Sequence, residues 1–188
     1  AVKVAVLQNY RWDTTITPLK PQYIIGNELV YRYDRETAFW AGNEYFYFDS
    51  KDIRVAASGI ARFTRDRLVG SYLFTNVSRA NSVYTYYPDI NGDLLITTVN
   101  GANPANEADY TQVHFALEGK STFWGKEVYV YGKFSNYELR DEYKLTYDEK
   151  DGLFKGKVLL KQGFYNYKFA TKEGRTIDFN EIGGNFYQ

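Results

Sequence analysis

Gly163-Phe-Tyr-Asn-Tyr-Lys-Phe-Ala170 is the stretch that decides the fold of this chain. Because successive side chains of a strand point to opposite faces, Tyr165, Tyr167 and Phe169 share one face and Phe164, Asn166 and Lys168 share the other. We assign the first face to a core. The stretch therefore predicts a β-strand buried on at least one side.

The same period of two recurs along the chain, and no stretch holds a helical period. Asn91-Gly92 and Asp151-Gly152 predict tight hairpins, since Asn and Gly accept a positive φ at little cost, and Gln162-Gly163 predicts another. The chain is thus expected to be all-β. The predicted strands are 3–7, 28–33, 45–48, 68–75, 82–87, 93–99, 111–117, 127–131, 143–146, 154–160, 163–170 and 176–179.

One polar run of small residues, Asn100 to Glu107, interrupts the strands, and its Pro104 cannot donate into a central ladder. We interpret this run as a linker. Short strands with turn signals between them are typical of sandwiches. The sequence therefore predicts two consecutive immunoglobulin-like β-sandwich domains, residues 1–103 and 104–188.

Composition excludes several classes of function. Twenty-three basic residues balance twenty-three acidic ones, which argues against a nucleic-acid binder, since such proteins carry excess cations. With no Cys and a single His, disulfides, thiolate nucleophiles and zinc sites of several Cys or His ligands are absent. Aromatic residues make up 19% of the chain, with Tyr alone at 19 positions. Tyr rings suit half-buried sheet faces and interfaces.

The second half carries a series of motifs: Val128-Tyr-Val-Tyr-Gly-Lys-Phe-Ser-Asn-Tyr137, Lys144-Leu-Thr-Tyr147, Gly152-Leu-Phe154 and Gly163 to Phe169. It resembles the early-set immunoglobulin-like domains related to glycogen-binding modules. The resemblance implies that Tyr137 stacks on a sugar and that Lys168 hydrogen-bonds it. The second stacking Trp of those modules is missing here, where residues 171–175 stand instead.

A wider resemblance covers essentially the whole chain and rests on five motifs in one order. It is to the plug protein family of the Bacteroidota type 9 secretion system, also described as a domain of unknown function, and it matches the middle and C-terminal part of that family. The motifs are Val6-Leu-Gln-Asn-Tyr-Arg-Trp-Asp13, Ala38-Phe-Trp-Ala-Gly-Asn-Glu-Tyr45, Tyr87-Pro-Asp-Ile-Asn-Gly92, Glu107-Ala-Asp-Tyr-Thr-Gln-Val-His-Phe115 and Leu159-Leu-Lys-Gln-Gly-Phe-Tyr-Asn-Tyr167.

This second resemblance implies a periplasmic, non-enzymatic protein without a cofactor, associated with the outer membrane. It implies that the protein caps the periplasmic mouth of a large outer-membrane β-barrel translocon, and that the N-terminal domain of the family is missing here. We expect a monomer. The alternative is a module that binds glucan-type polysaccharide through its C-terminal sandwich, and a hydrolase with a pair of carboxylates is a weaker third hypothesis.

Several candidate sites have ordinary structural interpretations. We interpret Asp89 to Asp93 as a hairpin turn rather than a Ca²⁺ loop, because Gly92 stands at position four and not six. His114 alternates with Val113 and Phe115 and is expected to be structural, since no nucleophile-elbow motif accompanies it. A basic cluster at positions 54, 62, 65 and 67 is either a solvated hairpin edge or a contact for an acidic surface.

Aromatic side chains that alternation turns away from the core are the leading candidates for a binding surface. Val128 and Val130 take one face of their strand, which leaves Tyr129 and Tyr131 on the other. This face is predicted either to pack against the first domain or to form an aromatic ligand platform. No catalytic or metal-binding residue is predicted. The predicted interaction or glycan surface consists of Trp124, Tyr129, Tyr131, Tyr137, Phe164 and Lys168.

Overall fold

The computed structural model describes residues 2–39, 42–56 and 58–184. Trp40 and Ala41 of the second motif lie outside these described residues. The chain divides into two compact units, residues 1–41 and residues 42–188, and each is described by itself. The secondary structure is almost entirely β, as the alternation predicted. Among the described residues, the longest helices have four residues, so none has the length to cross a membrane.

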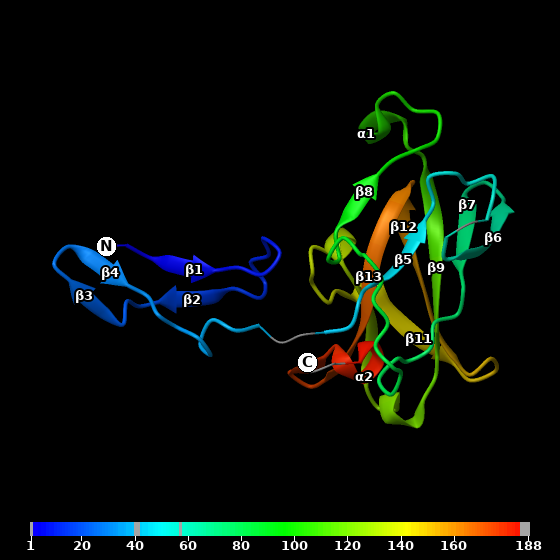
Figure 1. Cartoon of the computed structure of the whole chain (residues 1–188). Coiled ribbons are helices and arrows are strands. Elements are labelled where there is room, and N and C mark those ends of the chain that lie inside the picture. Colours follow the sequence, from blue (N-terminus) through cyan, green and yellow to red (C-terminus); the bar gives the residue numbers. More distant parts are fainter. Residues whose placement is uncertain (1, 40–41, 57, 185–188) are drawn as a thin grey trace. The chain divides into compact units, whose positions relative to one another are not determined.

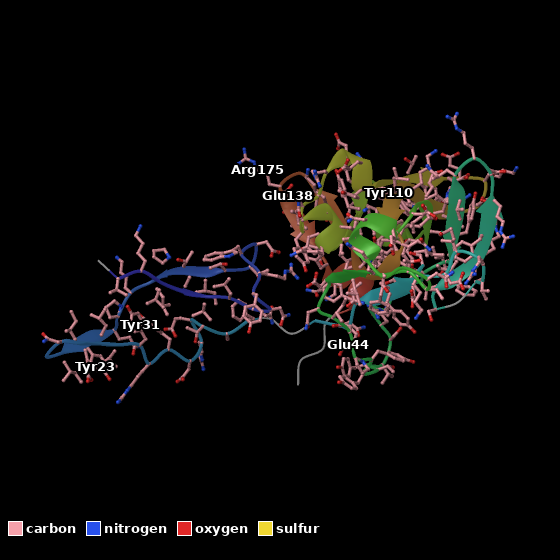
Figure 2. The ribbon with its side chains drawn as sticks, turned by 90° about the horizontal axis from the view of Figure 1, so that it is seen from above. Tyr23, Tyr31, Glu44, Tyr110, Glu138 and Arg175 are labelled. Carbon is pink, nitrogen blue, oxygen red and sulfur yellow. The ribbon has the colours of Figure 1, made fainter. Side chains whose placement is uncertain are left out.

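The first unit contains two antiparallel hairpins. β1 (Val4–Val6) pairs with β2 (Ile16–Leu19), and β3 (Tyr23–Ile25) pairs with β4 (Glu28–Val30) through a turn at Gly26 with φ of +57°. None of its described residues, 2–39, is buried, and Figure 2 shows Tyr23 projecting from β3. Isolated two-stranded ribbons have marginal stability in water, so this unit contributes no hydrophobic core to the chain.

The second unit is a sandwich of two β-layers. The layer that we call the β13 layer contains β5 (Phe46–Asp49), β8 (Leu94–Ile96), β10 (Glu127–Tyr131), β13 (Gly163–Glu173) and β14 (Thr176–Asp178). The β9 layer contains β6 (Ile60–Arg65), β7 (Val69–Leu73), β9 (Tyr110–Glu118) and β12 (Leu153–Lys161). Figure 1 shows both layers.

One strand joins the two layers. β11 (Lys144–Asp148) pairs with β10 through its first two residues and with β12 through residues 146–148. Among the described residues of this unit, all strand pairings are antiparallel except that of β7 with β9, which is parallel and is followed by a parallel bridge between Asn76 and Leu117. The short helices are α1 (Pro104–Glu107), α2 (Asn180–Gly183) and the 3-10 turns η1 (Ser121–Phe123), η2 (Lys133–Ser135) and η3 (Asp141–Tyr143).

The core lies between the layers and is rich in aromatic rings. Tyr165, Tyr167 and Phe169 point into it from β13, as predicted. Phe115 of the opposite layer meets the Tyr167 ring edge-on at 5.2 Å. The polar tips are satisfied because the Tyr165 hydroxyl donates to the Lys161 carbonyl and the Tyr167 hydroxyl donates to Asn76 Oδ1, at 2.6 and 2.8 Å.

The compact units differ from the domains predicted with a boundary at residues 103/104. β5 and β8, which precede that boundary, pair with β13, and β7 pairs with β9. Residues 42–103 and 104–188 therefore share one core, and the polar run at residues 100–107 is a loop with a helical turn inside one unit. Local patterns do not reveal a pairing between strands more than one hundred residues apart.

Two further predictions are wrong in detail. Residues 82–87, predicted as a strand, have no strand pairing and lie in a long irregular loop. Gln162-Gly163 is not a hairpin, because β12 and β13 belong to different layers and do not pair. Gln162 instead fixes the passage between the layers. Its Oε1 accepts from the Asp109 amide, and its Nε2 donates to the Lys51 carbonyl.

Candidate binding surfaces

The aromatic face predicted from β10 and β13 is present. Tyr131 lies directly opposite Lys168 in the strand register, and Tyr129 lies opposite Ala170. The two tyrosines are nevertheless buried, with Tyr131 only 5% exposed. The Tyr131 ring contacts those of Tyr137 and Phe179, with centroids 5.6 and 4.8 Å away. Four of the six predicted surface residues are thus brought together, but the two tyrosines of β10 lie under a cover of other side chains.

Segments of the same unit supply the rest of this cover. The Lys168 ammonium lies 4.2 Å from the centroid of the Tyr45 ring. The Tyr45 amide in turn donates to Asp89 Oδ2 at 2.7 Å. Asn166, at the centre of the face, is fully buried, and its Oδ1 accepts from the amides of Ile90 and Gly92. The middle of the predicted platform therefore serves as packing surface.

Phe164 and Trp124 lie apart from this cluster. Phe164 is half-buried and stacks on Tyr47 of β5 with centroids 5.7 Å apart. Trp124 is 66% exposed and follows η1, before the start of β10, whereas Tyr137 follows the end of β10. The structure consequently does not combine Trp124 and Tyr137 into one aromatic platform.

The loop of residues 74–93, which we call the β7–β8 loop, crosses this face. Its Arg79 is held firmly. The Arg79 amide donates to the Ile182 carbonyl at 2.7 Å, and its guanidinium donates to the Glu44 carbonyl and lies 3.8 Å from the centroid of the Phe46 ring. Burial lowers the pKa of Arg79.

A second anchor lies near the tip of the loop. The Tyr84 hydroxyl donates to the Glu44 carboxylate, a hydrogen bond that raises the pKa of the Tyr84 phenol. The turn that ends the loop has positive φ at Asn91 and Gly92, and Asp89 Oδ1 accepts from the Asn91 amide. Residues 89–93 therefore form a turn, but the predicted hairpin is wrong because residues 82–87 form no strand. Among the described residues, no three His, Cys, Asp or Glu side chains are grouped to hold a metal ion.

The tip of the anchored loop is apolar and exposed. Val83 is 89% exposed, Tyr86 70% and Tyr87 57%. The sequence did not single out these side chains, because their alternation resembled that of an ordinary strand. The absence of a strand partner is what leaves them at the surface.

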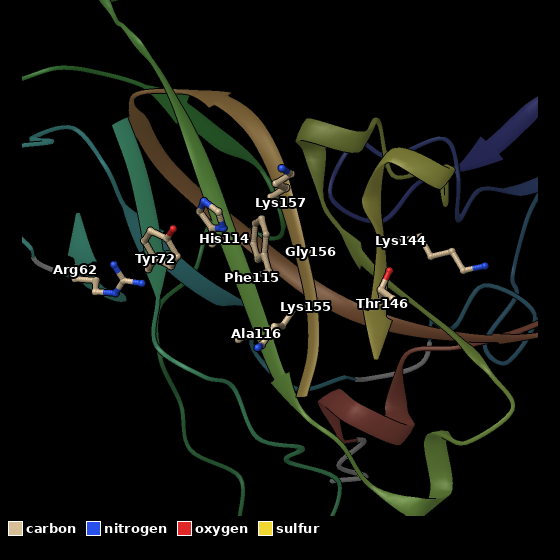
Figure 3. Close-up of a pocket in the computed structure, with 10 residues that line it drawn as sticks. All are labelled: Arg62, Tyr72, His114, Phe115, Ala116, Lys144, Thr146, Lys155, Gly156 and Lys157. Carbon is tan, nitrogen blue, oxygen red and sulfur yellow. The ribbon is translucent and has the colours of Figure 1, made fainter. Parts of the chain in front are cut away.

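A second surface lies on the outer face of the β9 layer and is a groove of about 580 Å³. Its wall is a row of four side chains from adjacent strands, which we call the cationic row: Arg62 of β6, Tyr72 of β7, His114 of β9 and Lys157 of β12. Each lies directly opposite the next in the strand register. Figure 3 shows the row beside Ala116, Lys155 and Thr146.

The rings in this row form a stack. The Arg62 guanidinium carbon lies 3.7 Å from the centroid of the Tyr72 ring. The Tyr72 and His114 rings are 4.0 Å apart and nearly parallel, at 6°. Burial first, and then the positive charges of Lys157 and Arg62, lower the pKa of His114. The imidazole is therefore kept neutral at pH 7.

The charged side chains that line the groove are all basic. Its lining side chains include Arg62, Lys144, Lys155 and Lys157 and no carboxylate. Lys144 pairs with Glu127, and Lys155 pairs with Asp148 and Asp151. Among the described residues, neither Arg62 nor Lys157 has an ion-pair partner.

The sequence identified only part of this surface. Arg62 belongs to the basic cluster, which the structure places on and around β6, at the end of the sheet order. Within that cluster, Arg54 pairs with Asp52, and Arg65 donates to the Arg54 carbonyl. His114 was expected to be structural. Its contact with Tyr72 depends on the parallel pairing of β7 with β9, and no local motif predicts that pairing.

No family model and no curated protein matches this sequence. Among solved structures, the chain is similar to the crystal structure of a hypothetical protein from Parabacteroides merdae, with 30% sequence identity and a TM-score of 0.87. The similarity covers 98% of this chain and 47% of that protein, so the chain spans about half the length of its relative.

Proposed function

We propose that this chain is a non-enzymatic protein that binds another protein through the β7–β8 loop. The observation that carries the proposal is the anchored, exposed apolar tip formed by Val83, Tyr86 and Tyr87. A loop of this length without regular structure is uncommon in a compact domain and is usually either functional or disordered, and the hydrogen bonds that anchor this loop favour function. Tyr side chains are enriched at the centres of protein interfaces.

The anchors of the loop favour binding. Arg79, Tyr84 and Asp89 fix the base and both flanks of the tip before any partner arrives. A rigid loop loses little conformational entropy on docking, so more of the contact free energy appears as affinity. This is the arrangement expected of a surface that docks as a preformed body.

For the partner, we propose the periplasmic mouth of the outer-membrane translocon of a type 9 secretion system, which the protein plugs or regulates. The support is the resemblance of the five sequence motifs to the plug family. A periplasmic location, in association with the outer membrane, is part of the same proposal.

Sugar binding through the second half of the chain is supported less well. The module that it resembles stacks sugars on exposed rings, whereas Tyr131 is buried and Lys168 lies against Tyr45. A glycan would have to displace residues that Asn166 and Asp89 hold in place.

A pull-down from detergent-solubilised outer membranes of a bacterium with this secretion system tests the proposal. The bait is the tagged chain, and bound proteins are identified by mass spectrometry. Wild-type protein and the Trp124→Ser control, which removes an exposed ring elsewhere, should retain one very large β-barrel protein. A Tyr86→Ser/Tyr87→Ser variant should lose it. Equal retention by both variants, or retention on glucan resin without any barrel, would contradict the proposal.

A further inference from the structure

The cationic row carries a second inference, which goes beyond the proposed function because it concerns the outer face of the other layer. Its two end members, Arg62 and Lys157, are exposed cations without ion-pair partners among the described residues. Charges of one sign lining a concave surface attract a ligand of the opposite sign. An arginine fork and a lysine ammonium both bind carboxylates.

The stacking restricts what kind of anion fits. One face of the Tyr72 ring lies under the Arg62 guanidinium and the other lies against the His114 ring, at 3.7 and 4.0 Å. Neither face of Tyr72 is therefore open for a sugar ring to stack on. What the row offers to a ligand is a line of polar edges, namely guanidinium N–H groups, a phenol, an imidazole and an ammonium.

The spacing of the row matches an extended peptide. Neighbouring strands lie about 4.8 Å apart, so the three intervals from β6 to β12 place the ends of the row about 14 Å apart. In an extended peptide, side chains at positions i and i+4 point to the same side and are about 13–14 Å apart. Carboxylates with that spacing can meet Arg62 and Lys157 together, and a carboxylate at i+2 then lies over Tyr72 and His114.

We propose that this groove binds an acidic, extended polypeptide segment, whose alternate Asp or Glu side chains lie along Arg62, Tyr72, His114 and Lys157. Lys155, two residues from Lys157 on the same face of β12, is paired with Asp148 and Asp151, so the proposal rests on Arg62 and Lys157. The site and the β7–β8 loop lie on opposite layers of the sandwich, so either can fail without the other.

Fluorescence anisotropy with a labelled oligoglutamate peptide at low ionic strength tests the proposal on the full chain, with oligoglutamine of equal length as the uncharged probe. Arg62→Gln/Lys157→Gln should weaken oligoglutamate binding about tenfold. The control Lys120→Gln/Arg175→Gln removes the same charge elsewhere on the surface. Arg175 lies in the turn between β13 and β14 (Figure 2). The affinity of this control for oligoglutamate should stay within about twofold of wild type.

Equal weakening by both variants would show only diffuse attraction and would overturn the proposal, as would no binding. If an oligogalacturonate of matched charge bound more tightly than oligoglutamate and lost its binding in the Arg62→Gln/Lys157→Gln variant, the ligand would be an acidic glycan and the peptide proposal would be overturned. A second readout does not depend on any variant. Because His114 is the one histidine in the sequence, its ring resonance is assigned directly, and oligoglutamate but not oligoglutamine should shift it and raise the pKa of His114.

Discussion

Replacing Phe48 by alanine tests whether residues 42–188 form one cooperative unit. The Phe48 side chain is fully buried, and its ring stacks on Tyr165 with centroids 4.9 Å apart and meets Phe115 of the other layer at 6.0 Å. Removal of a buried Phe side chain costs about 3–5 kcal/mol, and aromatic pairs add about 0.5–1.5 kcal/mol. We expect Phe48→Ala to destabilise the unit by about 4–5 kcal/mol.

Urea denaturation and backbone hydrogen exchange measure this effect. With a slope of about 2 kcal/mol per molar urea, the midpoint should fall by about 2 M. Exchange at the amides of Val113 and Phe169, both after residue 103, should accelerate about a thousandfold, since each 1.4 kcal/mol corresponds to a factor of ten. Ile24→Ala, which truncates an exposed residue of the first unit, is the control and should leave these amides unchanged.

Unchanged exchange in the second half of the chain would refute the interpretation of residues 42–188 as one cooperative unit. If residues 1–103 and 104–188 were separate domains, Phe48→Ala would leave exchange at Val113 and Phe169 at the wild-type rate, and urea would resolve two transitions. That outcome would show that the pairing of β5 with β13 contributes nothing to the stability of the second half.

Three further predictions concern single positions. Gly59→Ala should destabilise the protein by more than about 2 kcal/mol in urea titration, because Gly59 has φ of +87° and the new Cβ would lie 2.5 Å from a β5 carbonyl oxygen. The control Gly174→Ala, where φ is +58° and the space is open, should cost about 1 kcal/mol. Burial raises the pKa of Tyr167 in the folded state, so above about pH 10 the phenol ionises first in the unfolded state. The free energy of unfolding should therefore fall as the pH rises above about 10. In urea titrations above about pH 10, Tyr167→Phe should make this fall shallower. Lys157→Gln should raise the pKa of His114 in an NMR titration, and an unchanged value would contradict the charge coupling along the cationic row.

The strands of the second half were largely predictable, because their inward residues alternate without interruption. Tyr165, Tyr167 and Phe169 indicated both the strand and its buried face. β6 was not among the predicted strands, because its Arg62 and Arg65 were interpreted only as part of a basic cluster. Residues 82–87 were assigned to a strand because β propensity does not reveal whether a partner strand exists.

The candidate surfaces depended on information that local pattern does not contain. Alternation placed Tyr129 and Tyr131 on the outer face correctly, but whether that face is open depends on side chains from other segments, such as Phe179 against Tyr131 and Tyr45 against Lys168. The cationic row requires the register of four strands at once. A residue such as Tyr72, with no motif around it, gains its position only from that register.

Asn166 fastens one end of the β7–β8 loop to the outer face of β13. An amide side chain that points outward from the centre of β13 is fully buried, and its Oδ1 accepts from the backbone amides of Ile90 and Gly92. Without these partners, the oxygen would be a buried acceptor with nothing to satisfy it, at a cost of about 1–3 kcal/mol. The residue that interrupts the aromatic face therefore ties down one end of the loop, while Arg79 ties down the other. The hydrogen bonds that cover the centre of this face also anchor the loop that carries Tyr86 and Tyr87, the residues of the proposed protein-binding tip.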